Sequence, residues 1–227
     1  MSTVITLTTD FGTAGPYVAA MKGAVLSVNP DARIVDVSHE ISPQNVDEAA
    51  FVLAAAYPYF PAGCIHVAVV DPDVGALRRA IALVAPAGVF VGPDNGVLSC
   101  AVPDTHRLSS EGGPAALPRG FAAYAIDPRF HRHPVSDTFH GRDVFAPAAA
   151  HLSLGARPPE LGPALSEIVL LPPFRAVLRP DGALTARRPH RPVRQRHHDH
   201  RPRPAPGFAL RVGNRRQDGA AVFPDLR

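Results

Sequence analysis

Three aspartates stand after strand-like segments, where polar side chains of an α/β protein gather into binding sites. Asp10 follows TVITLTT, Asp71 follows IHVAVV, and Asp94 follows the apolar segment that ends near Val91. In an open parallel sheet, ligands bind beyond the carboxyl ends of the strands. One carboxylate there could bind two sugar hydroxyls, and another could handle a nucleophile. Each aspartate taken alone is better explained by a turn or a helix cap than by a function, so their grouping is what favours a site.

A positive charge lies close to the second of these aspartates. VVDPDVGALRRAI links Asp71 to Arg78 across a turn rich in proline and glycine. An arginine beside a carboxylate keeps it ionised and fixes its direction. The alternative is an exposed ion pair that contributes little to stability. One of the two adjacent arginines, Arg78 and Arg79, could also be simply solvated.

A histidine precedes a predicted helix in the motif TFHGRDVFAP. His140 titrates in the range of a proton carrier, although its spacing fits equally well a histidine that only hydrogen-bonds within the fold. Gly141 allows the backbone to approach a ligand closely. Asp143 is compatible with a helix N-cap. The sequence has no glycine-rich dinucleotide loop, phosphate-binding P-loop, nucleophile elbow or H-E-x-x-H zinc motif, and nothing in the sheet region predicts a metal site.

The elements that must position these residues alternate between strand and helix. The pattern predicts strands at 3–9, 32–37, 65–70, 81–85 and 89–91, and helices at 18–28, from 42 to 57, and at 143–154. This alternation predicts an α/β fold with a parallel, Rossmann-like sheet covered by helices on both faces. Residues 101–138, which contain EGGPAALPRG, are predicted to be a surface excursion.

Composition and charge exclude several classes of protein. The 227 residues are 46% hydrophobic and 19% charged, which is typical of a globular chain. No apolar run reaches the roughly 18 residues of a membrane span. The N-terminus lacks the basic start of a secretory signal, and Cys64 and Cys100 cannot form a disulfide framework, so we expect a cytoplasmic protein. The net charge of +3 reflects the tail, because thirteen arginines follow residue 174 and the remainder is acidic.

Six motifs occur in an order and spacing that closely resemble one enzyme family. They are TLTTDFG, YVAAMKG, IVDVSHEISPQNVDEAA, VVDPDVGALRRAI, VGPDNGVLS and TFHGRDVFAPAAAHL. Together they resemble the adenosine-forming S-adenosyl-L-methionine hydrolases, also called hydroxide adenosyltransferases, which are related to fluorinases and chlorinases. The resemblance covers roughly residues 3–180, and so many ordered motifs make chance an inadequate explanation.

The resemblance implies an architecture, an activity and a set of site residues. It implies an N-terminal α/β catalytic domain, here 1–165, a small C-terminal β-barrel domain, and a homotrimer with substrate between subunits. The implied reaction is attack of activated water or hydroxide on the ribose 5′ carbon, giving adenosine and L-methionine with no metal or redox cofactor. The family's Asp–Arg–His set falls on Asp71, Arg78 and His140, and its ribose-binding carboxylate falls on Asp10. Asn95 is a further candidate for binding substrate.

The branch of the family follows from two positions. Fluorinases carry serine where this chain has Gly141, and the halogenases have tyrosine where this chain keeps Asp71, so the hydrolase branch is favoured. Gly141 thereby joins the substrate-binding candidates. Asp73 departs from the family's D-P-G-V-G pattern and places an extra carboxylate near Asp71.

The tail does not continue the resemblance. The family's D-R-F-G-N motif is absent, yet synonymous codons for HRPVRQRHHDH at His190–His200, shifted by one base, encode I-D-R-F-G-N-V-I-T-T. We therefore hypothesise a frameshift near Thr185–Arg188, with 166–227 a disrupted β domain and 186–206 a disordered stretch rich in Arg, Pro and His. Gene sequencing tests this, since incompatible codons would leave a diverged tail as the explanation.

Three alternatives to an active hydrolase remain open at this stage. The lost C-terminal motifs favour weak or no activity, and so a remnant that only binds adenosine-type ligands and does not trimerise. A halide-using relative is disfavoured by the two positions above. The tract His197–His200 with its arginines could bind a metal or nucleic acid. We expect only non-specific nucleic-acid binding and no membrane partner.

Overall fold

The computed structural model describes residues 3–107, 112–178, 184–187 and 209–210. Apolar, β-branched segments form the central strands, and segments with helical spacing form the helices between them. The helices are α1 (Tyr17–Val28), α2 (Val46–Ala56), α3 (Asp104–Arg107) and α4 (Ala146–Ser153). The strands of the first half are β1 (Val4–Thr9), β2 (Arg33–Ser38), β3 (Cys64–Val69), β4 (Ala80–Ala85) and β5 (Gly88–Pro93). Those that follow are β6 (Gly113–Ala116), β7 (Ala122–Ala125), β8 (Ala164–Leu165), β9 (Glu167–Leu170), β10 (Arg175–Leu178), β11 (Leu184–Arg187) and β12 (Ala209–Leu210).

A seven-stranded sheet with the order β2-β1-β3-β5-β4-β7-β8 forms the centre of the fold. Strands β2, β1, β3 and β5 are parallel to one another, as the alternating pattern predicts. Strands β4, β7 and β8 are antiparallel to theirs. The prediction of a parallel sheet is therefore correct for only one half. The hairpin from β4 to β5 has only Pro86 and Ala87 between its strands, too short for a parallel crossover.

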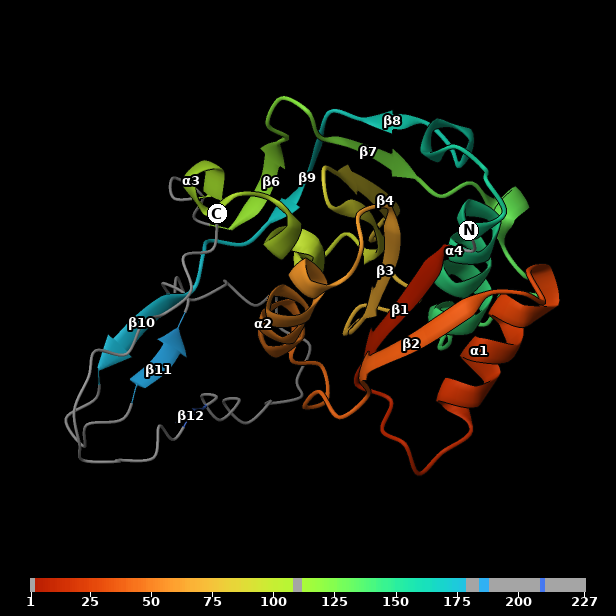
Figure 1. The fold of residues 1–227 in the computed structure, drawn as a ribbon, viewed down its shortest axis with the longest axis horizontal. Helices are drawn as coiled ribbons and strands as arrows, with labels where there is room; N and C mark the ends of the chain where they lie inside the picture. The colour runs from red at the N-terminus through yellow and green to blue at the C-terminus, as the bar shows by residue number, and fades with distance from the viewer. Residues whose placement is uncertain (1–2, 108–111, 179–183, 188–208, 211–227) are drawn as a thin grey trace.

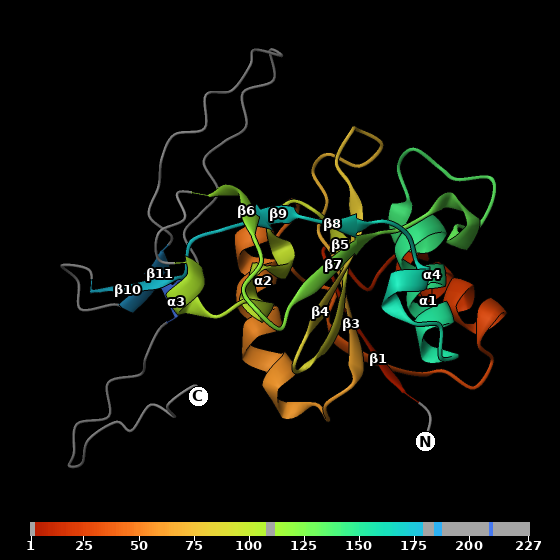
Figure 2. The same cartoon turned by 90° about the horizontal axis from the view of Figure 1, so that it is seen from above.

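Helices cover both faces of the sheet, as predicted. Figures 1 and 2 show α1 and α4 together on one face and α2 on the other. One buried cluster joins Met21 of α1 and Phe145 to the strands, and a second joins Leu53 of α2 and Phe90 of β5. In β3 the apolar side chains alternate between these clusters, since successive side chains of a strand point to opposite faces. In the described part of the chain, none of the helices is long and apolar enough to cross a bilayer.

Three local predictions need correction. The second helix begins at Val46 rather than Ser42, because the side chain of Asn45 caps it by accepting a hydrogen bond from the Glu48 N–H. Asp143 is not an N-cap, because it lies inside a π-helical turn, Gly141–Phe145, that leads into α4. The predicted excursion at 101–138 contributes β7 to the central sheet, with Ala123 buried.

The chain beyond the proposed domain boundary at residue 165 has two parts. Strand β9 pairs with β6, and its Ile168 and Leu170 belong to the second buried cluster. Strands β10, β11 and β12 form a separate antiparallel sheet. Residues 186 and 187, at the start of the predicted disordered stretch, are the end of β11. The remainder of that stretch, which includes His190–His200, lies outside the described residues, and so does Arg188, the last residue of the hypothesised frameshift region.

Candidate functional site

Asp71 and Arg78 form a nearly buried ion pair at the end of the sheet. Asp71 follows β3, and Arg78 precedes β4 at the other end of the connecting loop. The Nε of Arg78 lies 3.0 and 2.9 Å from the two carboxylate oxygens of Asp71, and its Nη2 also donates to Oδ2. The side chain of Arg78 is 8% exposed, and that of Asp71 is 5% exposed. The pair predicted from the sequence therefore forms with bidentate geometry in a largely dry setting, unlike an exposed surface pair.

The same guanidinium reaches His140, the N-cap of the π-helical turn. Nη2 of Arg78 lies 2.6 Å from Nδ1 of His140. Since a guanidinium only donates hydrogen bonds, Nδ1 must accept, and it carries no proton. A neutral ring then has its proton on Nε2. Burial and the positive charge of Arg78 both lower the pKa of His140, which favours this neutral state.

Asp10 lies close enough to Asp71 for the two charges to interact. Burial raises the pKa of Asp10, the N–H of Gln44 opposes that rise, and the negative charge of Asp71 adds to it. The Gln44 N–H donates to Oδ2 of Asp10 at 2.8 Å. Gln44 adopts a left-handed backbone, with φ of 63°, which is uncommon for a residue other than glycine. The loop before α2 therefore adopts an unfavourable conformation that directs one N–H at the Asp10 carboxylate.

Three aromatic rings pack beside Gly141. Phe11, Tyr17 and Phe139 lie with their ring centroids 5.3 to 6.2 Å apart in tilted or edge-to-face arrangements. A Cβ atom on Gly141 would lie 2.9 Å from Cζ of Phe11 and 3.0 Å from Cε2 of the same ring. The space that a side chain at position 141 would need is thus already filled.

The other predicted residues have structural contacts. Nδ2 of Asn95 donates to the Val70 carbonyl at 2.8 Å, and its Oδ1 accepts from the Val97 N–H at 3.1 Å. Asp94 accepts from Nε of Arg79 at 2.8 Å and from the Val169 N–H at 2.7 Å. Arg79 is therefore paired and not simply solvated. A contact of Asn95 with substrate stays a prediction.

Asp73 lies on the exposed loop that joins β3 to β4. Its carbonyl accepts from the Ala76 N–H at 3.0 Å, which closes the turn before Arg78.

Sequence reasoning brought the main set together but missed some of its surroundings. Arg78 contacts both Asp71 and His140, with Asp10 and Gly141 next to them, whereas the observed contacts of Asn95 support the strand end behind Asp71. Gln44 and the aromatic rings were not predicted. Phe11 and Phe139 directly follow and precede predicted site residues, and that adjacency was the available signal.

Among the described residues, no group of three or more His, Cys, Asp or Glu side chains is arranged to hold a metal ion. Cys64 and Cys100 are not joined by a disulfide bond.

Comparison with known proteins agrees with the motifs and the fold. A curated (R)-S-adenosyl-L-methionine hydrolase of Salinispora tropica is 47% identical over 171 residues, covering 74% of this chain and 60% of the relative. A fluorinase of Actinopolyspora mzabensis is 26% identical over 212 residues, covering 80% of this chain and 65% of the relative. The match therefore spans less than two thirds of either relative.

A solved structure supports the fold independently. An uncharacterized conserved protein of Thermotoga maritima superposes with a TM-score of 0.67 at 31% identity, covering 81% of this chain and 70% of that one. Residues 5–162 also match the SAM hydroxide adenosyltransferase N-terminal domain. That match takes in the Asp71–Arg78–His140 cluster, Asp10 and the whole parallel half of the sheet. The chain therefore belongs to the SAM hydroxide adenosyltransferase family.

Proposed function

We propose that this protein hydrolyses S-adenosyl-L-methionine to adenosine and L-methionine. The observation that carries the proposal is the single guanidinium of Arg78 bonded to both Asp71 and His140 beside a second carboxylate, Asp10. The names of the hydrolases in the same family support it.

The reaction needs a positioned oxygen nucleophile more than it needs activation of the leaving group. A water oxygen forms a bond to the ribose 5′ carbon as the bond from that carbon to sulfur breaks. The bonding electrons pass to the sulfonium, so methionine leaves as a neutral thioether, and one proton is released. Holding the water in line while excluding bulk solvent supplies the main rate enhancement. A metal or redox group has no required role in these steps.

The contacts of the site residues indicate a different role for each residue. Both oxygens of Asp71 and Nδ1 of His140 already accept hydrogen bonds from Arg78. His140 therefore acts through its Nε2–H, as a donor that orients the attacking oxygen, rather than as its base. The positive charge of Arg78 stabilises hydroxide character as the proton leaves, and Asp10 binds the ribose hydroxyls, as the family resemblance implies.

Gly141 favours water over halide as the nucleophile. A serine at this position would have to displace the Phe11 ring, because the first atom of its side chain already meets that ring. In the fluorinases, by resemblance, a serine hydroxyl at this position holds the halide. A halide-using activity would thus require a rearrangement of the aromatic cluster that this chain does not need for hydrolysis.

The proposal extends to the substrate form, the assembly and the location. The relative from Salinispora tropica is named for the (R) form of the sulfonium, and we propose the same diastereomer as the substrate here. Family resemblance supports a homotrimer in which the neighbouring C-terminal domain completes the site, and we propose a cytoplasmic location. A tail in the shifted reading frame would restore that domain.

The decisive experiment is turnover in water labelled with ¹⁸O. The chain, and a version carrying the shifted frame after Thr185, are each incubated with the (R) and (S) forms of S-adenosylmethionine. We expect methionine and adenosine with the label in the 5′ hydroxyl, formed faster from the (R) form. Added chloride or fluoride should leave the product unchanged. Absence of adenosine with both chains would refute the proposal, and 5′-halogenated product would favour the halide-using alternative.

A further inference from the structure

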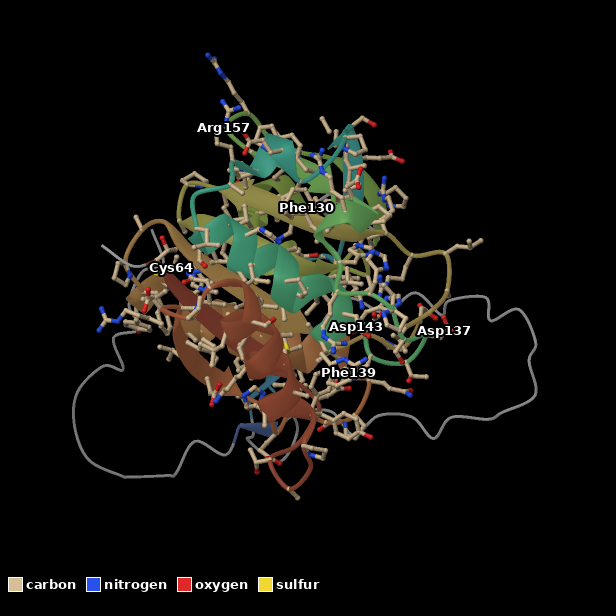
Figure 3. All side chains as sticks on the ribbon, turned by 90° about the vertical axis from the view of Figure 1, so that its right-hand side faces the viewer. Cys64, Phe130, Asp137, Phe139, Asp143 and Arg157 are labelled. Atoms are coloured by element: carbon tan, nitrogen blue, oxygen red, sulfur yellow. The ribbon has the colours of Figure 1, made fainter. Side chains whose placement is uncertain are left out.

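The residue that connects His140 to its surroundings is Asp143, whose side chain is fully buried. It lies in the π-helical turn Gly141–Phe145, three residues after His140. Single π-helical turns are rare and occur often at functional sites, because the extra residue alters the direction of the chain. Figure 3 shows Asp143, Phe139 and Asp137 near one another, on the side of the view away from Cys64.

The Asp143 carboxylate binds the two sides of this turn together. Its Oδ1 and Oδ2 accept from Nε and Nη2 of Arg142 at 2.6 and 2.7 Å. Oδ2 also accepts from the Ser136 N–H at 2.9 Å, and the Asp143 carbonyl accepts from the Arg132 N–H at 2.8 Å. The side chain of Arg132 approaches Oδ1 at 3.5 Å. Asp143 thus fixes the segment that leads into His140 at two points.

That segment in turn touches the loop between Asp71 and Arg78. A Cβ on Gly75 would lie 2.6 Å from the carbonyl oxygen of Asp137, so the two backbones are in direct contact. Gly75 has a φ of 79°, which glycine adopts without strain. The chain before His140 is therefore packed against the loop that carries its two partners, and Asp143 fixes the position of that chain.

We propose that Asp143 is a positioning residue for the reaction, setting the distance between His140 and Arg78 through the segment 132–139. This inference rests on the proposed function for its catalytic meaning. Asp143 does not reach the reacting atoms, because both its oxygens are bonded to Arg142 and Ser136. Burial alone would raise the pKa of Asp143, but the hydrogen bonds from Arg142 and Ser136 lower it, so the carboxylate is available in its charged form.

The ring of His140 provides a readout that does not depend on activity. The charged groups that act on its titration are Arg78, Asp71, Asp137 and Asp143, and the nearby ring of His131 interacts with it. Arg78 lowers the pKa of His140 and the charge of Asp143 raises it, so a change in that pKa would not separate a lost contact from a lost charge. The tautomer of the neutral ring does separate them, because the Arg78 guanidinium at Nδ1 keeps the proton on Nε2, and a ring released from that contact can carry its proton on Nδ1. A role for Asp143 in overall stability alone would lower the melting temperature without this change.

The test compares three variants of the full chain. Asp143→Asn keeps the size of the side chain but loses its charge, and Arg142→Gln removes the paired cation from a side chain that is 30% exposed. Glu160→Gln is the matched control, since Glu160 pairs with Arg157 on the surface, where the two side chains are 44% and 78% exposed. The His140 ring is followed by NMR from pH 4 to 9, its signal assigned by its loss in His140→Asn.

We expect the Nδ1–H tautomer of the neutral His140 ring to appear in the ¹⁵N spectrum of Asp143→Asn, to a smaller extent in Arg142→Gln and not in Glu160→Gln. In turnover, Asp143→Asn should lower kcat at least about tenfold with little change in KM, because it misplaces a group without removing substrate contacts. If Asp143→Asn does not fold, the tautomer in Arg142→Gln decides the matter.

A His140 ring that keeps its proton on Nε2, as in the parent, in every folded variant of Asp143 and Arg142 would overturn the proposal. So would an unchanged kcat for Asp143→Asn in an active protein. If neither the chain nor its version in the shifted frame forms adenosine, the proposed function fails, and the NMR spectra still decide whether Asp143 positions His140.

Discussion

Two aspartate–arginine pairs lie at the same end of the sheet, and their arginines are consecutive in the sequence. Arg78 pairs with Asp71, and Arg79 pairs with Asp94. Both carboxylates are nearly buried, with exposed side-chain fractions of 5% and 3%. The two pairs are alike in residue type and in the burial of their carboxylates, although Arg79 is 38% exposed and Arg78 only 8%.

The pairs differ in what else they bind. Asp94 and Arg79 use their remaining capacity on the backbone of β9, through the Val169 N–H and the Glu167 carbonyl. Arg78 instead binds the ring of His140, which can change its charge within the physiological pH range. The structural pair, Asp94 and Arg79, binds backbone groups, which do not titrate. The proposed catalytic pair binds a histidine ring, which does. Burial of the carboxylate and ion pairing alone therefore do not identify the site.

The largest expected effect is that of Asp71→Asn on turnover. The amide keeps the shape of the side chain but cannot hold both nitrogens of Arg78, so the guanidinium loses its fixed direction toward His140. We expect the rate of adenosine formation to fall by roughly 10²–10⁴-fold, the usual contribution of a positioned polar group in proton-transfer chemistry. Chromatography measures the rate, and circular dichroism checks the fold. Full activity in the folded variant would remove the distinction between the two pairs.

The histidines can be compared in the same way as the two pairs. His140 lies in the candidate site, whereas His66 lies in the core, and protonation of His66 should affect stability. Burial lowers the pKa of His66 to about 4, and the ring contacts Phe90, with centroids 4.8 Å apart, in the core. The unfolded chain binds this proton near pH 6.5, so stability falls as the pH drops below that value and levels off below the folded pKa. The loss should reach roughly 3 kcal/mol at most.

Urea unfolding between pH 7 and pH 4 measures this loss. His66→Gln should flatten the pH dependence relative to the parent, since the variant has no ring to protonate. His131, His140 and His151 also have lowered pKa values and contribute in the same direction, so the comparison with the variant isolates His66. An equal slope in both proteins would contradict the prediction.

Asp94→Asn should lower stability and leave activity unchanged, whereas Asp71→Asn should lower activity. The change weakens a buried, hydrogen-bonded pair without touching His140, so we expect a loss of about 1–3 kcal/mol of stability. Activity per folded molecule should stay near that of the parent. Thermal unfolding and turnover at a temperature well below the melting point measure the two effects. A loss of turnover as large as that of Asp71→Asn would show that the pairs act together.

How much of this arrangement the sequence predicts depends on how far apart in the chain the contacting residues lie. Asp71 and Asp10 follow strongly apolar strands, so their convergence at one edge follows from the α/β pattern alone. The role of Asp94 depends on β9, since its partner Val169 is 75 residues away in the chain. No local pattern distinguishes such a carboxylate from Asp71. Only the resemblance to a known family separated them before the structure did.

Backbone conformation is the other feature that the sequence left unpredicted. The left-handed Gln44 has no sequence signal, because residues other than glycine rarely adopt that conformation. The π-helical turn before α4 was expected as an ordinary helix, since its apolar spacing continues into α4. The antiparallel β4 was identified as a strand but not as part of a hairpin, although its short connection to β5 was visible in the sequence.

Asn95 lies between the two pairs, and its removal should give the smallest effect. Its amide holds the Val70 carbonyl, next to Asp71, while Asp94 precedes it in the chain. Asn95→Ala loses one hydrogen bond at each end of the side chain, so we expect about 1 kcal/mol of lost stability. Because Val70 leads directly into Asp71, kcat should fall severalfold. KM should stay constant if Asn95 acts only through this strand end. A rise in KM with an unchanged kcat would instead support the contact with substrate that the sequence predicts for Asn95. That outcome would extend the catalytic region toward the structural pair.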